Sequence, residues 1–174
     1  MIIPSEGLAF PSPGLINSPE MMALPLWPRG TGAFKWFFLS PFKRTRYLLT
    51  EHYITYIPIL KKWCYIPRNF TTDLASTPKI IPGISPDGPL IHGAVPHDFG
   101  YRFAAFFLSD GPGHPFVLVQ KTQRECDAIF TSLNNKSNGL KKSNKVIEKI
   151  LNAVGGLSFN QKDLRCVDWS KPVF

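Results

Sequence analysis

Three short motifs carry the residues of this chain that are best suited to chemistry. They read Thr72-Asp73-Leu74-Ala75-Ser76-Thr77-Pro78, then His97-Asp98-Phe99-Gly100-Tyr101, then Cys126-Asp127-Ala128-Ile129-Phe130. Ionisable groups are costly to bury, so carboxylates and an imidazole among aliphatic and aromatic neighbours need partners, a metal ion or a substrate. Any reaction that this chain performs is therefore expected at these motifs.

Four side chains from the motifs are the candidate catalytic residues: Asp73, His97, Asp98 and Asp127. If Asp73, Asp127 and either His97 or Asp98 converge, they could hold a divalent metal ion that activates water for hydrolysis. The same groups could act as an acid-base pair without a metal. A buried hydrogen-bonded network that joins the strand region to the helices is the third interpretation. The sequence leaves all three open, and a divalent metal is the one cofactor considered.

Helical geometry limits how these side chains can meet. On a helix, His97 and Asp98 would lie about 100° apart, so one of them is expected to face inward. Tyr101 lies one turn beyond His97 and shares its side of the helix. Asp127 lies about 60° from Phe130 around the helix axis, at the edge of a buried stripe where a carboxylate can point into a crevice.

The first motif also has a purely structural interpretation. Asp73 stands among threonines, a serine and a proline, so its carboxylate is suited to accept backbone N–H bonds in a turn or at a helix start. Ser76 is expected to be a hydrogen-bonding cap rather than a nucleophile, because turn residues surround it.

Taken together, the three motifs resemble a family that bacteriophages and prophages carry, catalogued as domain of unknown function thirteen fifty-three. Its members read roughly P-x-G-F-x-T-D-x-A-S-x-P, then H-D-x-x-Y, then A-D-x-x-F, and the resemblance covers about residues 50–155. Where the family has Gly, this chain has Asn69, which tolerates left-handed backbone better than most residues. The resemblance implies a phage origin and a site rather than a reaction. The motif residues that match beyond the four candidates are Phe70, Thr72, Ser76, Pro78, Tyr101 and Phe130.

Composition narrows the class of protein. A chain of 174 residues can bury one substantial core. Its net charge of +8 is spread along the chain without a nucleic-acid-binding motif, so the lysine-rich segments are interpreted as solvated faces and no specific nucleic-acid partner is expected. The three cysteines form no C-x-x-C pair, which favours reduced thiols. No signal peptide or membrane span is recognisable, so synthesis in the host cytoplasm is expected.

Residues 1–30 are expected to form an extended arm, because six prolines prevent a helix or a central strand there. The arm has too many apolar residues for a typical disordered tail. It is expected to pack on its own domain or on a neighbouring subunit, and we predict that much of it is buried against a partner chain. Proline lowers the entropy that such an arm loses on docking.

Residues 31–174 are expected to form a single α+β domain. Strands are predicted at 34–39, 46–50, 53–57 and 63–66, which form a small antiparallel sheet. About three helices should pack on it: one over 90–105 with a kink near Pro96, one that begins at the capping box Thr122-Gln123-Arg124-Glu125, and one from about 140 to the Gly-Gly pair at 155–156.

Two functions follow as hypotheses. The first is a bacteriophage virion component of the tail or head-to-tail region, located in the virion and binding other virion proteins through residues 1–30 and an aromatic surface. The family resemblance, the arm and the excess of aromatic residues support it. The second is a small hydrolase, with or without a metal, that acts on cell wall or another host polymer through Asp73, His97, Asp98 and Asp127.

Overall fold

A computed structural model describes residues 1–15, 18–24, 46–74, 90–154, 156, 159 and 162–173. This part contains three α-helices and two antiparallel sheets, so the predicted α+β class is confirmed. The helices are α2 (Ile91–Phe103), α3 (Gln123–Asn138) and α4 (Lys141–Val154), and a short 3-10 helix, η3 (Leu164–Cys166), follows them.

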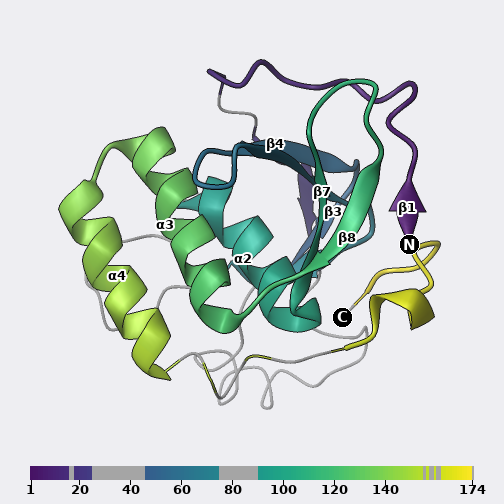
Figure 1. The fold of residues 1–174 in the computed structure, drawn as a ribbon. Helices are drawn as coiled ribbons and strands as arrows, with labels where there is room; N and C mark the ends of the chain where they lie inside the picture. The colour runs from purple at the N-terminus through teal and green to yellow at the C-terminus, as the bar shows by residue number, and fades with distance from the viewer. Residues whose placement is uncertain are drawn as a thin grey trace, which may run out of the picture.

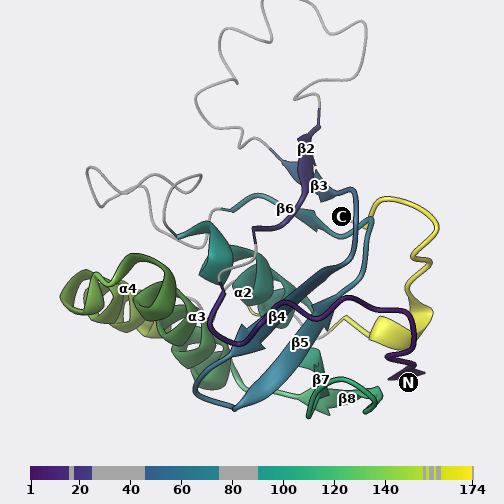
Figure 2. The same cartoon turned by 90° about the horizontal axis from the view of Figure 1, so that it is seen from above.

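The larger sheet has five strands and the smaller one has three (Figures 1 and 2). The strands of the larger sheet, in spatial order, are β1 (Ile2–Ile3), β8 (Phe116–Gln120), β7 (Ala105–Ser109), β5 (Lys62–Ile66) and β4 (Tyr53–Ile57). Those of the smaller sheet are β2 (Met21–Ala23), β3 (Tyr47–Leu49) and β6 (Thr71–Thr72). Three predicted strands are thus confirmed as β3, β4 and β5, whereas the one predicted at 34–39 lies outside the described residues. The prediction that they form one sheet is wrong, because β3 pairs with β2 and β6 in the smaller sheet.

Strands β7 and β8 are a correction to the sequence-based prediction, which placed no strand after residue 66. They pair with each other, and β7 also pairs with β5, so they form the middle of the larger sheet. Every residue of β7 is buried, so the alternation that marks a half-buried strand is absent. Helix α2 ends at Ala104 in the left-handed region, with φ of 50°, and no glycine marks this end in the sequence.

The described residues of the expected arm pack on their own chain. Strand β1 pairs with β8, and β2 pairs with β3, each at the edge of its sheet. The Phe10 ring stacks on Phe116 at 5.6 Å and meets Trp63 edge-on at 5.4 Å, both between ring centroids. In Figure 2 this segment crosses the larger sheet beside β4 and β5. The prediction that the arm is buried mainly against a partner chain therefore finds no support in these contacts.

The helices form successive layers on one side of the larger sheet (Figure 1). Helix α2 packs against β7, α3 packs against α2 and β4, and α4 packs against α3. The Phe99 side chain of α2 is fully buried among other aromatic rings and contacts Phe106 and Phe107 of β7. Burying one such ring contributes about 1.5–3 kcal/mol, so this contact fixes α2 on the sheet.

Candidate functional site

Helix α2 directs its two adjacent candidate residues to different elements. The Nε2 atom of His97 lies 2.8 Å from Oδ1 of Asp127 on α3. The next residue, Asp98, accepts a hydrogen bond at Oδ2 from the hydroxyl of Thr72 on β6. His97 and Asp98 thus point in different directions from α2, as predicted for neighbouring helical residues. They belong to two polar clusters, one towards α3 and one towards the smaller sheet.

The cluster towards α3 is sealed from solvent. His97 is 1 % exposed and Asp127 is 0 % exposed. The Tyr101 hydroxyl donates a hydrogen bond of 2.7 Å to the same Asp127 Oδ1 that His97 contacts. The His97 ring lies against Tyr101 with a centroid distance of 4.0 Å, and Phe130 meets it edge-on at 5.3 Å. A carboxylate with two hydrogen-bonding neighbours in an apolar shell is therefore the centre of this cluster.

A row of buried polar residues on α3 extends the cluster along the helix. Asp127, Thr131 and Asn134 follow each other at helical spacing and are all buried. The Asn134 side-chain oxygen accepts a hydrogen bond of 3.1 Å from the Gly93 backbone N–H on α2. Thr131, Asn134 and Gly93 were not predicted from the sequence. The spacing of 127, 131 and 134 on one helical face is the signal that could have found them.

Two glycines of α2 bring the helices close enough for these contacts. A Cβ atom on Gly93 would lie 2.6 Å from Nδ2 of Asn134. A Cβ atom on Gly100 would lie 2.5 Å from Phe106 Cζ and 2.8 Å from Cys126 Sγ. Real Cβ contacts are longer than this, so only glycine fits at either position. The close approach puts His97, which lies between the two glycines, within reach of Asp127.

Four buried polar atoms at the contact of α2 and α3 have no hydrogen-bond partner in the part of the chain that the structure describes. They are His97 Nδ1, Asp127 Oδ2, Thr131 Oγ1 and Asn134 Nδ2. A buried polar atom without a partner costs about 1–3 kcal/mol, which makes such a concentration unusual for a purely structural helix contact.

The second cluster anchors the first motif. The Thr72 hydroxyl, which donates to Asp98, also accepts the Leu74 backbone N–H at 3.0 Å. Arg102 carries a guanidinium whose pKa is lowered by burial, while Asp98 and Asp73 act in the opposite direction. The carboxylates of Asp73 and Asp98 therefore both interact electrostatically with the Arg102 guanidinium.

The C-terminal segment completes the surroundings of this motif. Asn69 has a φ of 66°, which confirms the left-handed backbone expected at the position where the family has Gly. Its side chain donates a hydrogen bond of 2.8 Å to the Trp169 carbonyl. Arg102 donates one of 2.9 Å to the Val173 carbonyl and lies 4.8 Å from the Phe70 ring centroid. Phe70 itself is fully buried.

The four candidates therefore do not form one cluster of contacts in the structure. Asp127 pairs with His97, and Asp98 pairs with Thr72 near Asp73. Within the described ranges, no three His, Cys, Asp or Glu side chains lie where they could hold a metal ion together. Ser76 and Pro78 lie outside these ranges.

Burial determines the protonation behaviour around Asp127. The pKa of Tyr101 is raised well above its usual value, chiefly by burial and then by its hydrogen bond to Asp127, while a hydrogen bond with Gln123 acts in the opposite direction. Burial, followed by the charge of Asp127, raises the pKa of the neighbouring Cys126 thiol to about 12. At neutral pH the Tyr101 phenol is thus a proton donor to Asp127 and not an anion.

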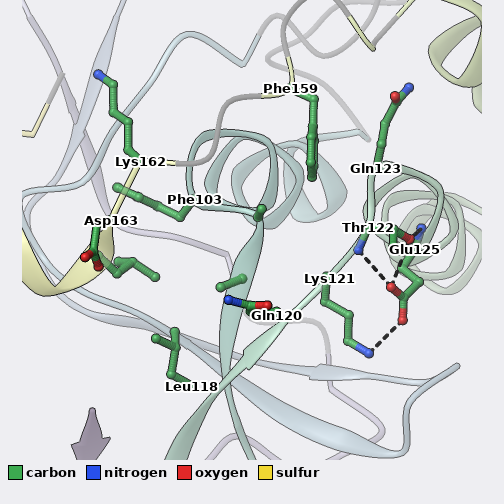
Figure 3. A pocket seen from close by; sticks show the side chains of 13 residues that line it. Phe103, Leu118, Gln120, Lys121, Thr122, Gln123, Glu125, Phe159, Lys162 and Asp163 are labelled. Carbon is green, nitrogen blue, oxygen red and sulfur yellow. Dashed lines mark hydrogen bonds and ion pairs between the residues drawn. The ribbon is translucent and has the colours of Figure 1, made fainter.

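A pocket of about 570 Å³ lies at the end of α2 and the start of α3 (Figure 3). Gln123 and Phe159 line it, and both contact Tyr101: Gln123 by the hydrogen bond above, and Phe159 edge-on with a centroid distance of 5.5 Å. Tyr101 thus connects the pocket wall to Asp127. The full lining is Phe103, Ala104, Ala105, Leu118, Gln120, Lys121, Thr122, Gln123, Glu125, Phe159, Lys162, Asp163 and Leu164.

The model of the family described as "Protein of unknown function (DUF1353)" matches residues 49–147, more than half of the chain. The chain belongs to this family, and the matched region contains all four candidate residues. No curated protein and no solved structure matches the chain significantly. None of the helices in the described ranges has the length and hydrophobicity needed to span a membrane.

Proposed function

We propose that this chain is a structural or accessory protein of a bacteriophage particle, in the tail or head-to-tail region, that binds other virion subunits. The observation that carries the proposal is the sealed position of the motif residues. His97 and Asp127 are inaccessible to a polymer substrate and join α2 to α3, while Thr72 and Asp98 join α2 to β6. A role in holding the fold together accounts for the hydrogen bonds that these residues form, without a reaction. The phage assignment depends on the resemblance of the three motifs to a phage-borne family.

The outer edge of the larger sheet is the surface that best fits a partner subunit. Ile2 of β1 and Val117 of β8 are paired residues on one face, and they are 67 % and 44 % exposed. Met1 beside them is 49 % exposed. Among the described residues no strand pairs with the outer side of β1, and apolar side chains at an open sheet edge favour association with another chain. In this proposal the N-terminal residues contact partners through this edge.

Analysis of particles tests the proposal. Mass spectrometry of phage particles purified from the host that carries this gene should detect the chain in a constant ratio to the other virion proteins. The Ile2→Lys and Val117→Lys double variant should be incorporated at least about tenfold less. Ile59→Lys is the matched control, because Ile59 is 57 % exposed in the turn between β4 and β5. Particles without the chain would contradict the proposal.

A hydrolase that acts on cell wall or another host polymer is the second candidate. The chain of contacts from the pocket through Tyr101 to Asp127 and His97 favours it, because His and Asp in hydrogen-bond reach are the usual pair in general acid-base catalysis. Turnover of purified cell wall, measured with added divalent metal and with a chelator, tests it. A hydrolase should lose at least about 100-fold in rate in His97→Gln and keep its rate in Arg124→Gln, an exposed position. No turnover by the wild type would remove this candidate.

A further inference from the structure

Helix α4 presents a strongly basic face to solvent. It carries Lys141, Lys142, Lys145 and Lys149, with Glu148 as its one acidic residue. At 100° per residue the four lysines fall within an arc of about 100°, and all four are exposed. We call them the α4 lysine face. Ile147 and Leu151, on the other side of the helix, are buried, and α4 packs on α3.

The four side chains of the α4 lysine face have no ion-pair partner among the described residues, in contrast to Lys62, Lys121 and Lys171. Lys121 pairs with Glu125, and Lys62 pairs with Asp110. Lys136 of α3 donates to the carbonyls of Pro13 and Leu15. Within the described ranges, the positive charge of α4 is thus not paired and is available to a partner.

The arrangement also opposes the stability of α4 itself. Lys141 and Lys145, and again Lys145 and Lys149, are like charges four residues apart, which destabilises a helix. Two lysines occupy the first turn, where the helix dipole favours acids, and this turn contains no acidic residue. A helix that served only as a solvated cover would gain stability from the opposite charges. Residues that destabilise the element that carries them are expected at functional surfaces.

We infer that the α4 lysine face binds the phosphate backbone of a nucleic-acid duplex without sequence preference. Lys141, Lys145 and Lys149 form a row with a step of about 6 Å, and lysine acts on phosphates as a point charge and does not read bases. Helix α4 has no aromatic residue on which the bases of a single strand could stack. Ile147 and Leu151 are buried, and Val146, which is 55 % exposed, is by itself too small an apolar surface to insert into a lipid membrane. This binding is separate from the proposed virion role and does not depend on it.

Fluorescence anisotropy with a short labelled DNA duplex of arbitrary sequence, over a range of salt concentrations, tests the inference. Four phosphate contacts predict a slope of about −3.6 in the plot of log K against log salt, or about 100-fold weaker binding for a fourfold rise in salt. An RNA duplex in the same assay distinguishes the two sources of the phosphate backbone, and either one fits the inference.

Two variants, each with four Lys or Arg residues replaced by Gln, distinguish binding by the α4 lysine face from binding by the overall charge of the protein. Both variants lose the same amount of positive charge. The test variant combines Lys141→Gln, Lys142→Gln, Lys145→Gln and Lys149→Gln. The control combines Lys61→Gln, Arg68→Gln, Arg124→Gln and Lys171→Gln, which lie on separate exposed segments. The test variant should bind at least about tenfold more weakly with a slope reduced by about 3–4, and the control should change less than about threefold.

Stability and membrane measurements complete the test. The test variant should melt at the wild-type temperature or above it, because its like-charge repulsion is removed. A lower melting temperature would overturn the argument that these charges serve a partner. Equal losses of binding in the two variants would show that only the overall charge matters. Binding to phosphatidylserine-containing vesicles but not to duplexes would replace the inference with a membrane role.

Discussion

At the scale of single residues, Asp127 has the most demanding position in the molecule. Its Oδ1 atom accepts the Tyr101 hydroxyl and lies 2.8 Å from His97 Nε2, while its Oδ2 atom is buried and has no partner among the described residues. A carboxylate in apolar surroundings is tolerated only when such hydrogen bonds compensate for its lost hydration. The stability of the chain should therefore depend strongly on this one group.

We predict that Asp127→Asn destabilises the fold by about 1–3 kcal/mol, because a neutral amide of similar size weakens both hydrogen bonds of a buried group. Urea unfolding followed by circular dichroism measures the change. Asp110→Asn is the control, since Asp110 makes an exposed ion pair of 2.6 Å with Lys62, and solvent screening makes the contribution of such a pair to stability small. Equal small losses in the two variants would contradict the importance of the Asp127 network.

The motifs identified the residues of this network, but the sequence left open how they combine. The helical spacing placed His97 and Tyr101 on one side, and both indeed contact Asp127. The same spacing could not decide which element each side of the helix faces. The assignment of Asp98 to Thr72 depends on β6, a strand of two residues with no pattern of its own.

At the scale of elements, the contact of α2 with α3 depends on glycine. Alanine is favoured over glycine within a helix by about 1 kcal/mol. We nevertheless predict that Gly100→Ala is destabilising by about 1–3 kcal/mol, because its Cβ would meet the buried Phe106 ring at 2.5 Å. Urea unfolding measures this change. Gly14→Ala is the control, since a Cβ there meets nothing within 4 Å and should change stability by less than about 0.5 kcal/mol. A more stable Gly100→Ala protein would show that the helices can separate at little cost.

The start of α3 makes stability depend on pH. The Glu125 carboxylate accepts the Thr122 backbone N–H at 2.8 Å and the Lys121 ammonium at 2.9 Å, which completes the predicted capping box (Figure 3). The hydrogen bond from the Thr122 backbone, followed by that from Lys121, lowers the pKa of Glu125 from 4.5 to about 2.

Because the pKa of Glu125 is lower in the folded chain than in the unfolded chain, its contribution to stability is complete above pH 4.5 and is lost as the pH falls towards about 2. We predict that Glu125→Gln is less stable than the wild type at pH 7 and that this difference shrinks between pH 4.5 and about 2. Thermal melting of both proteins across this range measures it. A difference that stays constant with pH would show that the charge of Glu125 does not matter.

The elements that the sequence predicted well carry local signals. The capping box marked the start of α3, the Gly-Gly pair marked the end of α4, and β-branched and aromatic residues marked β4 and β5. Strand β7 was missed because it is buried throughout and follows directly on α2. Strands β1 and β2 depend on pairing with β8 and β3, which no local pattern in a proline-rich segment reveals.

At the scale of the whole molecule, segments outside the matched family region complete its structure. The match spans residues 49–147, yet β1 and β2 extend the two sheets from the N-terminal side. From the C-terminal side, Trp169 and Val173 accept hydrogen bonds from Asn69 and Arg102 around the first motif. The residues that define the family therefore depend for their surroundings on residues that the family match does not cover.

The reactivity of the three free cysteines tests whether the core is as tightly packed in solution as in the structure. Cys64 and Cys126 are fully buried on β5 and α3, and burial raises the pKa of both thiols, whereas Cys166 in η3 is exposed. We predict that Ellman's reagent reacts rapidly with one thiol per chain in the native protein and with all three in concentrated guanidinium chloride. Cys166→Ser should abolish the rapid reaction, because only unfolding then exposes a thiol. Rapid reaction of a second thiol in the native protein would mean that the layers around Cys64 and Cys126 open readily, and the sealed Asp127 network could not then be the basis of the structural role.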